Sequence, residues 1–122
     1  MNRDSGALEL CVLVLYRTEL YNKLIYALND AGIRGATTVS SSGMMSALAD
    51  SEDSHIIAAF RAFMASDRRE SKTVFMVIEK DKLERVRKVV RETVGDLSAP
   101  NTGILFTVPV TFADGFCEDA RP

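Results

Sequence analysis

The sequence predicts an α+β fold in which two helices cover one face of a four-stranded antiparallel sheet. Two segments, residues 8–16 and 73–79, are apolar on both faces, as expected of strands in the middle of a sheet. Two further segments, residues 18–31 and 82–94, carry apolar residues at helical spacing. The chain has 122 residues, of which 47% are hydrophobic, so we expect one compact domain over residues 1–122.

Residues 8–32 are expected to form the first strand and the first helix. In "LELCVLVLY" the even-numbered residues Leu8–Tyr16 point to one side and the odd-numbered residues Cys11–Leu15 to the other. The segment "TELYNKLIYALNDAG" then has a helical apolar stripe, and Gly32 is a natural helix end. The stripe consists of Leu20, Leu24, Ile25 and Leu28.

The second strand and a long connection follow. "GATTVSSSGM" predicts a more polar strand from Gly35 to about Ser42. Residues 44–72 are long for a plain connection, and "HIIAAFRAFMA" within them predicts a short helix. Its apolar stripe consists of Ile56, Ile57, Phe60, Phe63 and Met64. Such stripes usually pack on their own protein, so we favour this over a surface that docks a partner.

The last third of the sequence predicts strand, helix and strand. After "TVFMVIE", Asp81 and Glu84 resemble a capping box at the start of "KLERVRKVVRETV", and Gly95 ends this helix. The residues expected to face inward are Leu83, Val86, Val89, Val90 and Val94. "GILFTVPV" is the final strand, and Pro109 indicates a sheet edge or a strand end.

Without the connection, the order is strand–helix–strand–strand–helix–strand (βαββαβ), the ferredoxin-like arrangement. Its two helices cover only one face of the sheet. The opposite face would expose half of each apolar strand, which is more apolar surface than a monomer usually tolerates. The pattern therefore predicts a closed homo-oligomer that packs sheet against sheet.

Composition and motifs exclude several classes of function. A net charge of −2 with no basic stripe argues against nucleic-acid binding. The apolar run 7–16 is interrupted by Glu9 and is too short for stable membrane insertion.

Cys11 and Cys117 form no CxxC motif, which favours a reduced, cytoplasmic protein. The single histidine, His55, fits a helix start better than a metal site. No hydrolase, zinc-protease or nucleotide-binding motif is present, so we expect neither an enzyme nor a bound metal.

"GIRGATTVSSSGM" (residues 32–44) and the strand "GILFTVPV" resemble the PII signal proteins (nitrogen regulatory protein P-II) and their PII-like relatives. The resemblance implies trimers that bind ATP or ADP in clefts between subunits. It also implies a target-binding T-loop, here replaced by the helical insert of residues 44–72. Thr37 would then lie against the adenine. Ser41, Ser42 and Gly43 would begin the T-loop near the phosphates, and the loop with Asn101, Thr102 and Gly103 would occupy the position of the phosphate-binding loop.

The cations that a phosphate needs are missing from that loop. Residues 93–109 contain no Lys or Arg, so an effector smaller or less charged than a nucleotide triphosphate fits the sequence better. Arg68, Arg69 and Lys72 are either a solvated turn or substitutes for the missing lysines. The small polar residues of "SSSGMMS" are either an anion site or a simple strand end.

Together these features predict a cytoplasmic, PII-like regulatory homotrimer. It would bind a small effector, an adenine nucleotide by resemblance, and would regulate an unknown target protein. Two alternatives remain: a trimer similar to the CutA family, which is associated with divalent-cation tolerance, and an assembly module without a ligand. A mobile insert and an open cleft favour signalling, whereas a rigid insert and a dry cleft favour assembly.

Overall fold

The computed structural model describes residues 7–44 and 70–116. The predicted helix 56–64 lies outside these ranges, as do His55, Arg68, Arg69 and Cys117. The elements are β1 (Leu8–Leu15), η2 (Thr18–Leu20), α1 (Tyr21–Asp30), β2 (Ala36–Ser41), β3 (Ser71–Glu79), η3 (Lys80–Lys82), α4 (Leu83–Thr93) and β4 (Gly103–Val110). The predicted βαββαβ order and the ferredoxin-like fold class are thereby confirmed.

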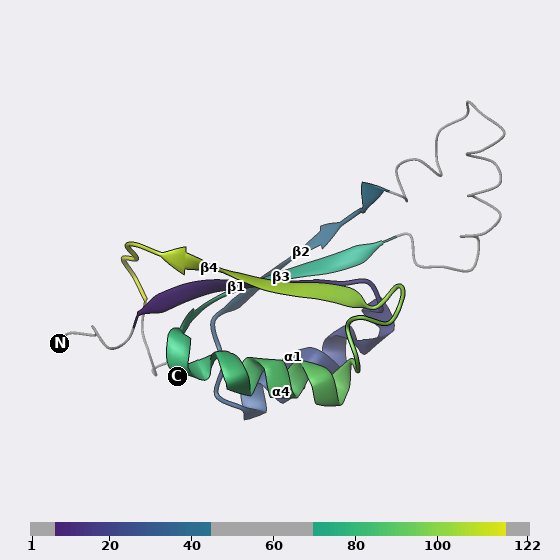
Figure 1. Cartoon of the computed structure of the whole chain (residues 1–122), viewed down its shortest axis with the longest axis horizontal. Helices are drawn as coiled ribbons and strands as arrows, with labels where there is room; N and C mark the ends of the chain where they lie inside the picture. Colours follow the sequence, from purple (N-terminus) through teal and green to yellow (C-terminus); the bar gives the residue numbers. More distant parts are fainter. Residues whose placement is uncertain (1–6, 45–69, 117–122) are drawn as a thin grey trace, which may run out of the picture.

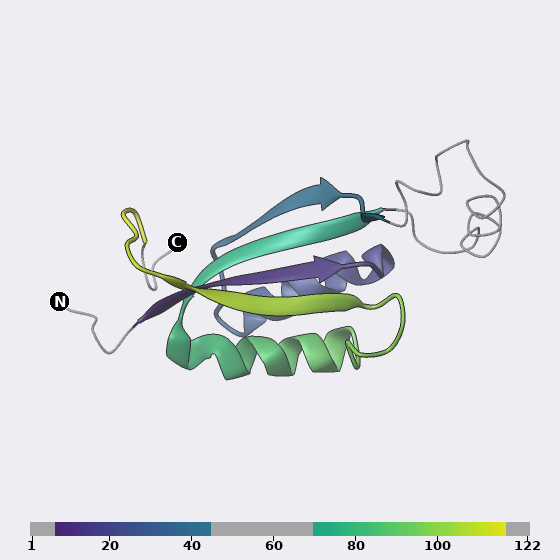
Figure 2. The same ribbon diagram turned by 45° about the horizontal axis from the view of Figure 1, so that its top comes forward.

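The four strands form one antiparallel sheet in the order β2-β3-β1-β4. β2 and β4 are therefore the two edges, and the central strands β3 and β1 separate them (Figure 2). The position of Pro109 in β4 fits this order, because a proline without an N–H is tolerated on an edge strand. Helices α1 and α4 lie side by side on the same face of the sheet (Figure 1).

The core lies between this helix-facing side and the two helices. Alternation along the strands places Cys11, Leu13 and Leu15 of β1 there, paired across the sheet with β3 and β4. From the helices, the predicted residues Leu24, Leu28, Val86, Val90 and Val94 complete the buried set. The backbone turns out of α1 at Gly32, where φ is +91°, a conformation that favours glycine.

The predicted capping box at the start of α4 is wrong. Asp81 lies inside the 3-10 turn η3, and the residue that precedes the helix is Lys82. Lys82 makes no side-chain cap hydrogen bond. The chain therefore enters α4 through a tighter turn, which moves the Asp81 carboxylate away from the N-cap position.

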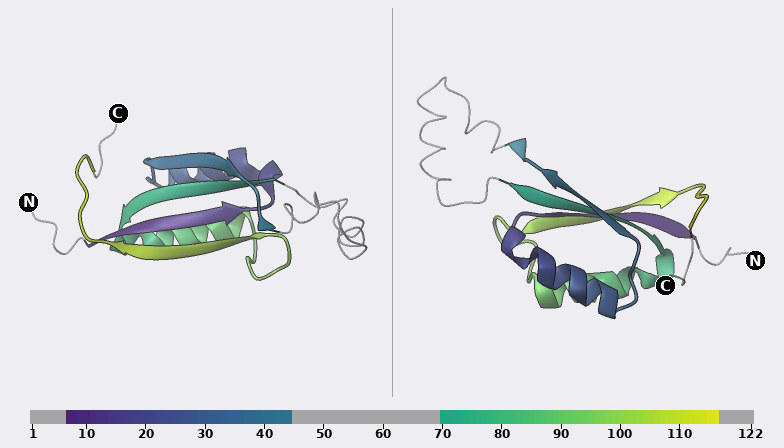
Figure 3. Two further views of the ribbon diagram at one scale, coloured as in Figure 1. Left: turned by 90° about the horizontal axis from the view of Figure 1, so that it is seen from above. Right: turned by 180° about the vertical axis from the view of Figure 1, so that it is seen from behind.

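The second face of the sheet, called the open face below, is not covered by either helix (Figure 3). It carries Leu8, Leu10, Val12, Val14, Thr37, Val39, Ser41, Ser71, Thr73, Phe75, Val77, Glu79, Ile104, Phe106, Val108 and Val110. Large apolar side chains are exposed on it, with Ile104 at 51% and Phe106 at 47%. Val12 is shielded because its cross-strand neighbours are Phe75 and Phe106. The predicted apolar face is thus present in the chain.

Among the described residues, no helix is both long and apolar enough to cross a membrane.

Candidate functional site

The seven candidate ligand residues lie at opposite edges of the sheet. Thr37 and Ser41 belong to β2, with Ser42 and Gly43 directly after it, whereas residues 101–103 lead into β4. Two strands separate these edges, which at normal strand spacing corresponds to about 14 Å. Within one chain, the two halves of the predicted site therefore do not meet.

Thr37 and Ser41 both point to the open face, but in different surroundings. Thr37 pairs with Phe75 and is exposed, so its hydroxyl and methyl groups are free to contact a ligand on that face. Ser41 pairs with Ser71 at the far end of β2 and is half-buried. Thr37 is thus the more accessible of the two.

The Ser41 hydroxyl belongs to a small hydrogen-bonded cluster. Its Oγ lies 2.7 Å from Ser71 Oγ and 2.8 Å from Thr73 Oγ1. Ser71 and Thr73 are only 3% and 9% exposed, so their protons need an acceptor inside the protein. In each of the two bonds either hydroxyl can be the donor, so Ser41 links the two buried hydroxyl groups as an acceptor, a donor or both.

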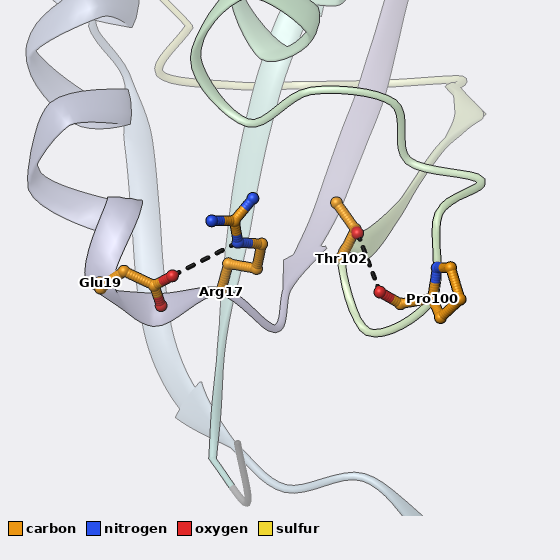
Figure 4. A network of polar contacts seen from close by, with 4 residues as sticks. All are labelled: Arg17, Glu19, Pro100 and Thr102. Atoms are coloured by element: carbon orange, nitrogen blue, oxygen red, sulfur yellow. Dashed lines mark hydrogen bonds and ion pairs between the residues drawn. The ribbon is translucent and has the colours of Figure 1, made fainter. Parts of the chain in front are cut away.

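The loop before β4 uses its polar groups to hold its own conformation. The Asp96 carboxylate accepts hydrogen bonds from Ser98 N at 2.9 Å and Ser98 Oγ at 2.7 Å. The Ser98 hydroxyl and then its N–H lower the pKa of Asp96, so the carboxylate is charged at neutral pH. Thr102 Oγ1 donates to the carbonyl of Pro100 at 3.2 Å (Figure 4). Asn101 has a φ of +59°, which asparagine tolerates well.

Gly103 has a packing role at the end of this loop. It pairs with Leu15 of β1, and a Cβ atom there would lie 2.6 Å from the carbonyl oxygen of Val14. Next to it, Tyr16 N donates to the carbonyl of Thr102 at 3.1 Å. The small residues of this loop are therefore explained by turn formation and close strand approach, and the carboxylate of Asp96 within the loop opposes phosphate binding.

Arg17 is a cation beside this loop that sequence reasoning missed. It follows β1, and Figure 4 shows it between Glu19 and Thr102. Its Nε donates to Glu19 Oε2 at 3.3 Å, and its side chain is 41% exposed. The signal was available in the sequence, because the end of β1 lies next to the start of β4 in this fold. Since Glu19 offsets its charge, Arg17 replaces only part of the charge of the missing lysines.

Lys72 does not lie on the face that carries Thr37 and Ser41. It pairs with Ser40 on the helix-facing side, where its Nζ donates to Ser40 Oγ at 3.2 Å. The prediction that Lys72 substitutes for the loop lysines at the Thr37–Ser41 site is therefore not supported by its orientation. The physical reason is strand alternation, which sends Ser71 and Lys72 to opposite sides.

Other reactive groups in the described part of the chain are sparse. No group of three His, Cys, Asp or Glu residues there could hold a metal ion. Cys11 is a buried free thiol, and burial followed by the charge of Glu9 raises its pKa to about 11. The Oε1 atom of Glu9 is buried without a hydrogen-bond partner.

Comparison with solved structures shows a PII-like fold. The chain is similar to PII of Arabidopsis thaliana bound to citrate, with a TM-score of 0.58 and 18% identity over 86% of this chain and 78% of that one. It is also similar to a functionally unknown protein from Pediococcus pentosaceus, with a TM-score of 0.60 and 15% identity over 91% and 99% of the two chains. No family model and no curated protein matches the chain.

Proposed function

We propose that the protein is a PII-like regulatory homotrimer that binds a small effector in clefts between subunits. The observation that carries this proposal is the division of the candidate residues between the two edges of one sheet. A ligand that touches Thr37 and the loop of residues 101–103 together needs the β2 edge of one copy beside the β4 edge of another. Such a contact joins two different surfaces, and it closes into a ring when three copies complete the rotation.

The open face supports the same assembly. It combines exposed Val39, Ile104, Phe106 and Val108 with the half-buried Phe75, and these residues come from β2, β3 and β4. Lys and Arg are absent from its sixteen side chains, so a second copy can cover it without burying an unpaired cation. Apolar faces of this extent mark interaction surfaces in soluble proteins.

The effector that fits this chain is small and carries little charge. Thr37 offers an exposed hydroxyl group opposite Phe75, and Ser41 offers a half-buried hydroxyl group on the same face. The Asp96 carboxylate lies in the loop that would have to face a phosphate chain. AMP meets these conditions better than ATP does. Citrate, which is bound to the Arabidopsis protein, is a tricarboxylate and therefore tests how much negative charge the site accepts.

Regulation follows if the effector binds one arrangement of the cleft more tightly than another. The connection between β2 and β3, which contains most of the predicted insert of residues 44–72, begins after Ser41 and ends before Ser71, so it starts and ends beside the proposed cleft. We propose that a cytoplasmic target protein reads this segment, and that the effector shifts its population between two arrangements. The buried free thiol of Cys11 fits the reducing compartment.

Light scattering tests the assembly. Three chains of 13.4 kDa give a mass of about 40 kDa. Phe106→Ser on the open face should lower the mass toward that of a monomer. Tyr26→Ser on the outer side of α1 removes an equally aromatic, 72% exposed side chain and should leave the mass unchanged. A monomeric wild-type protein would contradict the proposal.

A thermal-shift panel with ATP, ADP, AMP and citrate, each with and without magnesium, tests the effector. A ligand at 100 times its dissociation constant stabilises the folded state by about 2.7 kcal/mol per site. We expect AMP to raise the melting temperature more than ATP or citrate does, and Thr37→Ala to remove the increase. A stable trimer that none of these ligands stabilises would instead support the assembly module, which the self-bonded loop of residues 96–103 also favours.

A further inference from the structure

We propose that Lys72, Ser40 and Thr38 form a binding site for an oxyanion, a carboxylate or a phosphate group, on the helix-facing side of β2 and β3. This site lies on the side of the sheet opposite Thr37 and Ser41. It is therefore separate from the effector cleft, and the inference does not depend on the proposed function. It applies equally to one chain and to a trimer.

Three elements meet at the site. Ser40 and Thr38 lie two residues apart on the same side of β2, and Lys72 of β3 pairs with Ser40. Tyr21 opens α1, and its hydroxyl donates to Thr38 Oγ1 at 2.9 Å. The Lys72 Nζ lies 5.6 Å from the centre of the Tyr21 ring and 3.2 Å from Ser40 Oγ.

Counting protons shows that the site is rich in donors and poor in acceptors. Thr38 accepts its bond from Tyr21, so its own hydroxyl proton is not used by that bond. Ser40 likewise accepts from Lys72, which leaves the Ser40 proton and two of the three ammonium protons unused by that bond. Four protons around one positive charge thus remain to be donated. An anion with several oxygen atoms is the group that such a set of donors recognises.

The charge of Lys72 also lacks a compensating carboxylate among the described residues. In residues 7–44 and 70–116, the ion pairs join Arg17 to Glu19, Arg87 to Glu84 and Lys88 to Glu92, and none involves Lys72. The contacts of Lys72 are instead an aromatic ring and a hydroxyl group. Although the chain has a net charge of −2, Lys72 is thus a half-buried residue whose ammonium group has no ion-pair partner in this part of the chain.

A role in linking α1 to β2 does not by itself explain why Lys72 and Ser40 lie beside Tyr21 and Thr38. The Tyr21–Thr38 hydrogen bond already links the helix to the strand. Lys72 adds a cation that contacts the Tyr21 ring and the Ser40 hydroxyl group, and these contacts restrict its position. A fixed cation loses less conformational entropy when it binds an anion than a freely moving surface lysine does.

An NMR titration of the full-length protein tests the site, with inorganic phosphate and acetate as separate probes and sodium chloride holding the ionic strength constant. We expect saturable shifts of the backbone amide signals of Thr38, Ser40 and Lys72. Lys72→Gln should weaken binding at least tenfold, and Ser40→Ala should weaken it by a smaller factor. Saturation by phosphate alone would identify a phosphate site, and saturation by acetate a carboxylate site.

Lys88→Gln is the matched control, because Lys88 is an exposed lysine that faces Glu92 at 3.9 Å on α4. It should bind both probes as the wild-type protein does. An unchanged melting temperature of Lys72→Gln would show that its loss of binding is not a loss of folding. Shifts that spread evenly over all Lys and Arg residues, or that persist in Lys72→Gln, would overturn the proposal. A monomeric wild-type protein that still binds here would contradict only the proposed trimer.

Discussion

Gly103 is expected to be required for stability, independently of any ligand. A Cβ atom at this position would lie 2.6 Å from the carbonyl oxygen of Val14 and 3.6 Å from the Cα of Leu15. Both neighbours are backbone atoms of β1, so neither can move aside as the end of a side chain would. Gly103→Ala must therefore push β4 away from β1 where Gly103 pairs with Leu15. Such overpacking costs about 1–3 kcal/mol.

Thermal unfolding without ligand measures this cost. For a domain of this length, each kcal/mol lowers the melting temperature by about 4 °C, so Gly103→Ala should lower it by about 4 to 12 °C. Gly43→Ala is the control, because Gly43 was predicted to bind the same ligand, but a Cβ atom at that position would have no neighbouring atom within 4 Å. Its melting temperature should change by less than about 2 °C. A Gly103→Ala protein as stable as the wild type would contradict the packing role of Gly103 and would support the predicted ligand-binding role instead.

Two further predictions concern the hydroxyl cluster and the buried thiol. Ser41→Ala should lower the free energy of unfolding by about 1–3 kcal/mol in urea titrations, because the buried hydroxyl groups of Ser71 and Thr73 lose a hydrogen-bond partner. Ser42→Ala, at an exposed position, should have almost no effect. Burial raises the pKa of Cys11 from 9.0 to about 11. The unfolded chain therefore loses the thiol proton at a lower pH than the folded chain does. The free energy of unfolding should fall between pH 9 and 11 for this reason, by at most about 2.7 kcal/mol. Cys11→Ala should lack this part of the decline, and an identical alkaline decline in both proteins would contradict the raised pKa.

The fold was predictable because its signals are local and repeated. Alternation in β1 and helical spacing in α1 and α4 each involve several residues, so one misleading position does not alter the prediction. The capping box at the start of α4 depended on only two residues, Asp81 and Glu84, and there the prediction was wrong. A 3-10 turn and an N-cap favour similar residues, so the sequence did not separate them.

The candidate site was only partly predictable, because the roles of its residues depend on neighbours far apart in the chain. The sequence shows that residues 93–109 lack cations, but it does not show that Asp96 and Ser98 bond to each other. The packing of Gly103 against Val14 arises from strand pairing over almost ninety residues. The sequence therefore does not distinguish a glycine that would contact a phosphate from a glycine that allows two strands to approach each other closely.

Strand alternation also separates the two ligand proposals from each other. Ser71 and Lys72 are adjacent in the sequence, yet Ser71 meets Ser41 on the open face and Lys72 meets Ser40 beside Tyr21. A shift of one residue in the pairing of β2 would instead place Ser40 opposite Ser71 on the open face and Val39 opposite Lys72 on the helix-facing side. Lys72 would keep its side, because the pairing of β3 with β1 sets the two faces of β3. The alternation of β3 that keeps this cation off the open face thus also leaves Lys72 available for an anion on the other side.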